Sequence, residues 1–232
     1  MQSSKEIVLG LDTSGSPLLL AVGCGDKKVF RRRKGVKQER LLFPALQEAL
    51  AVLRASLQDV KRIFIVRGPG RFTGIRISST FASMLKYLNN AEVRGAPLFE
   101  VLYRQAVSSK KFKNWKKQHP EGAVAVVLHA FREEYFLQIF DERQTSPAWL
   151  SREELLQRLS VYSHPLFVVG SDKNSSSLND LLDGKFVLAD TVDCFPRHTT
   201  LLEMSQEDIW EKDALEPLYL KPARFELIEP KP

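Results

Sequence analysis

Apolar and polar positions follow two different periods along the chain, and these periods predict its helices and strands. Short apolar runs between turn residues predict strands, and apolar positions three and four residues apart predict helices. In the first half, the predicted strands cover 6–12, 18–25, 27–33, 62–66 and 92–97. The predicted helices cover 40–57, 75–88 and 98–107. Gly25 and Asp26 are typical hairpin residues, so they are expected to join the second strand to the third.

The second half partly repeats this order. A hairpin is predicted over 122–130 and 133–142, and the strands and helices after it are expected over 151–160, 165–170, 175–183, 185–190 and 199–211, with an extended tail over 216–222. Ser151 and Glu154 form a capping-box pattern. The repeat indicates an α/β fold with two related halves. We therefore expect an N-terminal lobe over 1–109, a basic linker over 110–121, and a smaller C-terminal lobe with a tail over 122–232.

The stretch between the fourth strand and the next helix contains Gly68, Gly70 and Gly74. This spacing matches neither a dinucleotide fingerprint nor a Walker loop. A helix N-terminus after a glycine turn can hold an anion, with Thr73 as its N-cap and Arg71 adding positive charge. Alternatively, the glycines only form a tight turn that lets the strand and the helix pack together. The residues alone leave both interpretations open.

The same stretch resembles the glycine-rich signature of the TsaB family at Gly68, Pro69, Gly70 and 72–76, and departs from it at Arg71, where serine is usual. Three weaker matches lie at 9–16, 41–50 and 215–221, so the resemblance covers most of the chain. TsaB is a glycoprotease-like subunit of the machinery that makes threonylcarbamoyladenosine in tRNA. The resemblance implies an actin-like ASKHA fold, in which two RNase H-like lobes are related by duplication and the second is reduced.

The resemblance also implies vestigial cofactor-binding positions at Asp12, Thr13, Gly70 and Thr73, with no catalytic residue, no metal and no cofactor. The family's catalytic relative, TsaD, carries two histidines one helical turn apart, which can share a metal. The four histidines here are far apart in sequence: His119, His129, His164 and His198. Gln38 stands about where many TsaB proteins have a histidine. Asp12 is alternatively a turn residue that accepts backbone N–H bonds.

The helix predicted near residue 40 carries more apolar surface than one packed face needs. Nine of its apolar residues between Leu41 and Leu53 spread over roughly 200°, whereas a stripe of about 100° covers a core. The resemblance implies that this helix and the helix over 75–88 pack against a TsaD-type partner. The interface residues expected on these helices are Leu42, Ala45, Leu46, Ala49, Leu53, Ile77, Ser79, Thr80, Ser83 and Met84. The alternative is that the first helix is covered within its own fold, for example by the C-terminal tail.

Composition limits the alternatives. The 232 residues are 44% hydrophobic and carry a net charge of +6, with no apolar run of about 18 residues and no secretion signal. A cytoplasmic protein is expected, with no membrane partner. Cys24 and Cys194 are expected to be small buried residues. Lysines and arginines cluster over 27–40 and 110–117, which allows weak tRNA contact, with aromatic stacking from Phe112 and Trp115, or merely a solvated turn and linker.

We therefore expect a non-catalytic subunit that forms a heterodimer with a TsaD-type transferase, in a complex with a TsaE-type ATPase. Self-association in the absence of the partner is left open. A second hypothesis is a stand-alone ASKHA kinase or ATPase that uses Asp12, Thr13 and the glycine loop. A metallopeptidase is a third, and the missing histidine pair argues against it.

Overall fold

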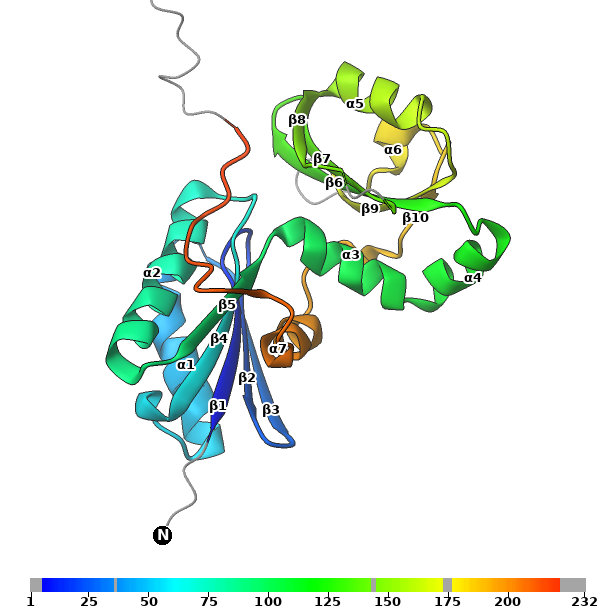
Figure 1. The fold of residues 1–232 in the computed structure, drawn as a ribbon. Helices are drawn as coiled ribbons and strands as arrows, with labels where there is room; N and C mark the ends of the chain where they lie inside the picture. Colours follow the sequence, from blue (N-terminus) through cyan, green and yellow to red (C-terminus); the bar gives the residue numbers. More distant parts are fainter. Residues whose placement is uncertain (1–5, 36, 143–144, 173–176, 222–232) are drawn as a thin grey trace, which may run out of the picture. The chain divides into compact units, whose positions relative to one another are not determined.

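A computed structural model describes residues 6–35, 37–142, 145–172 and 177–221. The chain forms two compact units. Among the described residues, the first unit contains 6–105 and 196–218, and the second contains 106–195 and 219–221. Each unit is built on one β-sheet with helices packed on it (Figure 1).

The first unit has a six-stranded sheet in the order β11-β5-β4-β1-β2-β3. Its strands are β1 (Ile7–Asp12), β2 (Leu18–Cys24), β3 (Lys27–Arg33), β4 (Val60–Val66), β5 (Glu92–Ala96) and β11 (Glu211–Lys212). β1, β4 and β5 run parallel, whereas β1, β2 and β3 pair antiparallel, as does β11 with β5. The predicted hairpin at Gly25 and Asp26 is confirmed.

Helices cover both faces of this sheet. Figure 1 shows α1 (Gln38–Leu53) and α2 (Phe72–Asn89) on one side and α7 (His198–Gln206) on the other. Alternation along β4 explains both layers, because Ile63 and Ile65 join the core under α1 and α2 while Phe64 packs with α7. α7 lies so close to β1 that a Cβ on Gly10 would be 2.8 Å from the backbone of Leu201. The helix α3 (Leu98–Ser108) follows β5.

The second unit has a five-stranded sheet in the order β10-β9-β6-β7-β8. Its strands are β6 (Ala123–Phe131), β7 (Glu134–Phe140), β8 (Ala148–Ser151), β9 (Leu166–Ser171) and β10 (Val187–Leu188). The helices α5 (Arg152–Ser160) and α6 (Asn179–Leu182) pack on one face. The predicted capping box of Ser151 and Glu154 begins α5, as expected.

The two sheets share one topology, which confirms the duplication that the element order predicts. In each, the third, second, first, fourth and fifth strands lie side by side in that order, and a helix precedes and another follows the fourth strand. The helices of the second unit are shorter, since α5 has 9 residues against 16 in α1, and α6 has 4 against 18 in α2. Among the described residues, no helix combines the length and the apolar character that a membrane crossing requires.

The expected linker is wrong over most of its length. Residues Lys110–Gln118 form the helix α4, because the hydroxyl of Ser109 accepts the N–H of Phe112 and caps the first turn. The lobe boundaries differ as well, since 196–218 return to the first unit. Cys24 and Cys194 are half-buried, not buried as expected, and form no disulfide.

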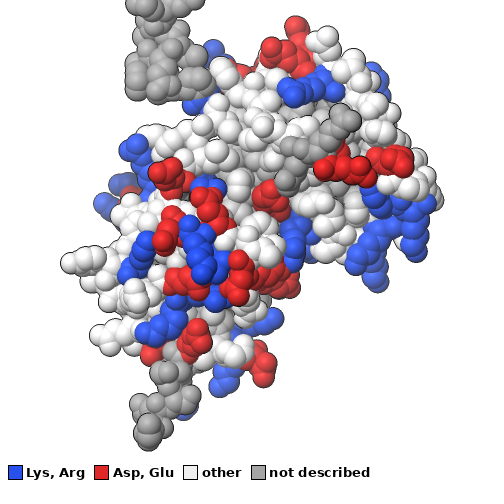
Figure 2. Space-filling model, viewed as in Figure 1, with Lys and Arg blue, Asp and Glu red and all other residues white. Residues whose placement is uncertain are grey.

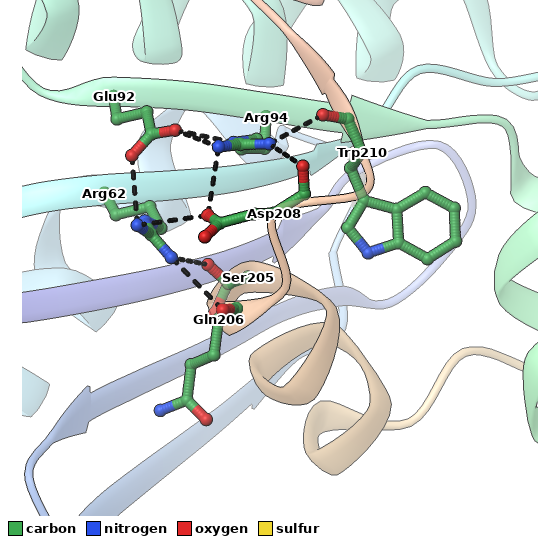
Figure 3. Close-up of polar contacts among 7 residues, drawn as sticks. All are labelled: Arg62, Glu92, Arg94, Ser205, Gln206, Asp208 and Trp210. Carbon is green, nitrogen blue, oxygen red and sulfur yellow. Dashed lines mark hydrogen bonds and ion pairs between the residues drawn. The ribbon is translucent and has the colours of Figure 1, made fainter.

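The helix predicted over 199–211 ends at Gln206 because an arginine cluster holds the chain that follows it (Figure 3). Arg94 is only 2% exposed and donates to the carbonyl groups of Asp208 (2.6 Å) and Trp210 (2.9 Å). Its guanidinium also pairs with the carboxylates of Asp208 and Glu92. The segment after α7 is therefore fixed beside β5, where β11 adds to the sheet edge.

Replacing this arginine tests its structural role. We expect Arg94→Ala to lower the free energy of unfolding by about 2–4 kcal/mol, because buried carbonyl and carboxylate groups lose their donors. The matched control is Arg104→Ala, which removes a more exposed ion pair with Glu207 and should cost less than about 1 kcal/mol. Urea unfolding of both variants measures the difference, and equal losses would contradict it.

Candidate functional site

The glycine loop, defined here as Gly68–Gly74, connects β4 to α2 and packs on the turn that follows β1. A Cβ on Gly74 would lie 1.9 Å from the carbonyl oxygen of Thr13, and one on Gly70 would lie 2.4 Å from that of Ser14. The Thr13 hydroxyl donates to the Gly74 carbonyl (2.7 Å), and the Arg71 N–H donates to the Ser14 carbonyl (2.6 Å). The chain's own backbone thus fills the space that the missing side chains leave, which favours the packing interpretation of the glycines.

The start of α2 differs from the prediction. The helix begins at Phe72, and its N-cap is Arg71, whose side chain makes no capping hydrogen bond. Thr73 is therefore not the N-cap, and it lies exposed in the first turn. Of the four expected cofactor positions, Asp12, Thr13 and Gly70 meet at the turn, whereas Thr73 faces the groove described below.

Asp12 stabilises the turn that follows β1. Its carboxylate is 3% exposed and accepts both the N–H (2.8 Å) and the hydroxyl (2.6 Å) of Ser14. Burial raises the pKa of Asp12, and the two bonds from Ser14 act in the opposite direction. Gln38, at the first position of α1, is buried and donates to the carbonyl of Gly15 (2.8 Å). Hydrogen bonds thus join the turn after β1 to the glycine loop on one side and to the start of α1 on the other.

The corresponding turn of the second unit is different. The ring of His129, near the end of β6, forms a hydrogen bond with the carbonyl of Arg132 in the same turn (2.9 Å).

Across the parts of the chain that the structure describes, no group of three or more histidine, cysteine, aspartate or glutamate side chains is placed to hold a metal ion.

The centre of the wide apolar arc on α1 belongs to the first unit's own core. Five of its expected interface residues are at most 6% exposed: Leu42, Ala45, Leu46, Ala49 and Leu53. The assignment to a partner contact is wrong for Ala45, Leu46, Ala49 and Leu53, because the middle of the arc faces the sheet. Leu215, from the C-terminal segment, packs against the same core. The two edges of the arc are exposed to solvent instead, since Phe43 is 44% exposed and Val52 is 62% exposed.

One of these edges faces α2 across an apolar groove of about 430 Å³. The groove is lined by Glu39, Leu42, Phe43, Phe72, Thr73, Arg76, Ile77, Thr80, Phe81 and Met84. Phe81 is buried and meets the ring of Phe43 edge to face at 5.6 Å, whereas Phe72 is 56% exposed. The guanidinium of Arg76 lies 3.9 Å from the centre of the Phe72 ring.

The sequence prediction located part of this groove. Ile77, Thr80 and Met84 line it as expected interface residues, and only Leu42 does so from α1. Ser79 is buried and Ser83 is exposed, and both lie outside the lining. Phe72 was missed because the helix was expected to begin at residue 75. Arg76 lies within the predicted helix but was interpreted only as part of the glycine-rich signature. Phe43 was also missed, although its position at the edge of the predicted apolar arc could have identified it as a groove residue.

Two sheets of one topology, each beginning with a hairpin and continuing through parallel strands, define an actin-like fold of the ASKHA type. Solved structures agree, since YeaZ from Pseudomonas aeruginosa superposes with a TM-score of 0.70 at 20% identity, over 93% of this chain and 100% of that one. A second structure, of an uncharacterized Pseudomonas aeruginosa protein with similarity to peptidase YeaZ, gives a TM-score of 0.69 at the same identity and coverage.

Sequence comparison finds relatives that carry one name. The tRNA threonylcarbamoyladenosine biosynthesis protein TsaB of Bacillus subtilis is 22% identical over 94% of this chain and 96% of its own length. TsaB of Buchnera aphidicola is 27% identical over 49% of this chain and 52% of its own. The family model of TsaD, tRNA N6-adenosine threonylcarbamoyltransferase, matches residues 37–136. The chain is thus similar to a TsaB protein over nearly its whole length.

The packing role of the glycine loop gives a direct test. We expect Gly74→Ala to destabilise the protein by about 3 kcal/mol or more, because the added Cβ would overlap the Thr13 carbonyl oxygen. Gly15→Ala is the matched control, since a Cβ there would meet nothing within 4 Å. Thermal unfolding of both variants compares them, and a Gly74→Ala protein as stable as the control would show that this contact is not required.

Proposed function

We propose that this chain is a subunit of the machinery that makes N6-threonylcarbamoyladenosine in tRNA, and that it binds a TsaD-type threonylcarbamoyltransferase through the groove between α1 and α2. The observation that carries the proposal is the groove itself, an apolar surface that the chain's own core leaves uncovered. The names of its TsaB relatives and the TsaD model that matches residues 37–136 support it.

The groove has the chemistry of a helix-binding surface. Phe43 and Phe72 project from its rim, Phe81 and Leu42 form a buried floor, and Arg76 adds a charge over an aromatic ring. Aromatic residues, methionine and arginine are enriched at protein interfaces, and an apolar groove of this kind receives a helix through side chains three and four residues apart.

The match to the TsaD model suggests which surface of the partner contacts the groove. The matched region, 37–136, contains α1, the glycine loop and α2, so a TsaD-type protein carries a segment similar to this one. We propose that the two related helix pairs face each other, as related surfaces do across a two-fold interface. The same geometry would let two copies of this chain pair when the partner is absent.

In this proposal the chain contributes no catalytic group. Asp12 is engaged by Ser14, and the glycine loop is packed against Thr13, which supports a structural role for the positions that a nucleotide-hydrolysing relative would use. The transfer to tRNA then takes place in the TsaD-type partner and ATP hydrolysis in a TsaE-type subunit. The chain works in the cytoplasm with them and touches tRNA only weakly.

The groove is tested with two charge substitutions in exposed positions. We expect Thr80→Glu to weaken binding of the TsaD-type partner at least about tenfold, because a charge would be desolvated in an apolar seam. Val52→Glu, on the opposite edge of α1, should leave the affinity unchanged. Leu46→Glu is unsuitable because Leu46 is 1% exposed and the charge would disrupt the core.

Calorimetric titration of the partner measures both affinities, and thermal unfolding checks that both variants are folded. Unchanged partner binding by Thr80→Glu, or an equal loss in Val52→Glu, would contradict a groove-specific contact.

The non-catalytic assignment is tested at Asp12. Asp12→Asn keeps an oxygen that can accept both bonds from Ser14, whereas alanine would leave those donors unpaired. We expect Asp12→Asn to support tRNA modification in the reconstituted complex within about twofold of the unchanged protein, because the amide oxygen keeps both hydrogen bonds of the turn. A stand-alone ATPase that needs this carboxylate would instead lose at least about a hundredfold in ATP turnover.

A further inference from the structure

The second unit carries a row of lysines on α4 that the proposed function does not use. The helix has the sequence KKFKNWKKQ, with five lysines and no acidic residue. Figure 2 shows lysine and arginine side chains gathered where α4 lies in Figure 1. This is one of two basic clusters in the sequence, and the two differ in their surroundings.

The inward face of α4 is aromatic. The rings of Phe112 and Trp115 lie 5.3 Å and 5.4 Å from that of Phe167 on β9, and Trp115 is buried. Stacking of these rings on nucleic-acid bases, which the sequence suggested, is therefore wrong, because they pack inside the unit. Their packing fixes the helix on the sheet and turns the lysines outward.

Three of the lysines form one exposed stripe. Lys111 pairs with Asp190 (3.2 Å), and Lys116 donates to the carbonyl of Gly122 (2.6 Å). Within the described ranges, Lys110, Lys113 and Lys117 make no ion pair, and all three are exposed. Their spacing of three and four residues places them on one helix face, in a row about 10 Å long.

This arrangement does not serve the stability of the helix. Lys110 and Lys113 lie in the first turn, where the helix dipole disfavours positive charge. Lys113 and Lys117 are like charges one turn apart, which costs about 0.2–0.5 kcal/mol. A repulsive row held on a rigid helix suits an anionic partner, since the partner's charge relieves the repulsion.

The other basic cluster lies on a strand instead of a helix, and part of its charge is paired. On β3, at the edge of the first sheet, Arg31 and Arg33 both pair with Glu48 of α1. Charged residues on an edge strand also hinder pairing with other chains. These ion pairs account for two of the cluster's arginines within their own unit.

We propose that the stripe of Lys110, Lys113 and Lys117 binds the phosphate backbone of the tRNA that the complex modifies. A nucleic-acid strand carries a phosphate about every 3.4 Å along a duplex axis, so a 10 Å row of ammonium groups faces several of them. The contact positions the tRNA without sequence specificity, because point charges on phosphates carry no base information. The inference rests on the proposed function for the identity of the RNA.

The test uses the full chain and an unmodified tRNA transcript with adenosine beside its anticodon. We expect Lys110→Gln, Lys113→Gln and Lys117→Gln combined to weaken binding about tenfold near 50 mM salt. The slope of log affinity against log salt should become shallower by about two units, because each lost phosphate contact contributes about 0.7–0.9. Fluorescence anisotropy at several salt concentrations measures both quantities.

The matched control removes the same charge elsewhere. Lys27, Lys28 and Lys34 are exposed lysines on or beside the β3 hairpin, and their combined change to glutamine should alter the tRNA affinity less than about threefold. An equal loss in both triple variants, or no loss in the α4 variant, would overturn the proposal, since net charge alone would then explain the binding.

Partner binding separates this inference from the proposed function. The α4 variant should bind the TsaD-type partner normally, and Thr80→Glu should bind tRNA normally. If the α4 variant loses the protein partner instead of tRNA, the stripe contacts an acidic protein surface and the RNA assignment is wrong, while the groove proposal is judged by Thr80→Glu alone.

Discussion

The arrangement of the first unit depends on one close contact between two stretches of backbone. The glycine loop and the turn after β1 approach so closely that a single methyl group at Gly74 would overlap the carbonyl of Thr13. Asp12 holds that turn from one side and Gln38 from the other. Because Gln38 begins α1 and the glycine loop leads into α2, the same contact fixes where both helices begin.

This contact connects the fold to the proposed function. With their first turns fixed on the sheet, α1 and α2 bury the middle of their apolar faces in the core and leave a groove between their outer edges. A loop that resembles a phosphate-binding element thus shapes the groove that we propose binds a partner, because its backbone is packed on the turn beside it. Nucleotide chemistry would require that packing to open, whereas partner binding uses the exposed surface as it stands.

Sequence periodicity predicted the two related halves and the main strands, because buried strands are nearly continuous apolar runs that local pattern identifies well. It missed α4 and predicted a linker there, because the two aromatic rings of this lysine-rich segment indicate a packed face only when Phe167 is known to lie against them. It also could not divide the arc on α1 between core and surface. That division depends on where the sheet lies, which a helical wheel does not contain. Arg94 gave no sequence signal, because its partners near residue 208 are distant in the chain.

Hydrogen–deuterium exchange of the chain, with and without a TsaD-type partner, tests the central claim most directly. The account predicts that partner binding slows exchange over 38–43 and 72–84, the segments that border the groove, and leaves α5 and α6 unchanged. Slowed exchange at Asp12–Gly15 and the glycine loop on addition of ATP alone, with none at the groove when the partner is present, would contradict it.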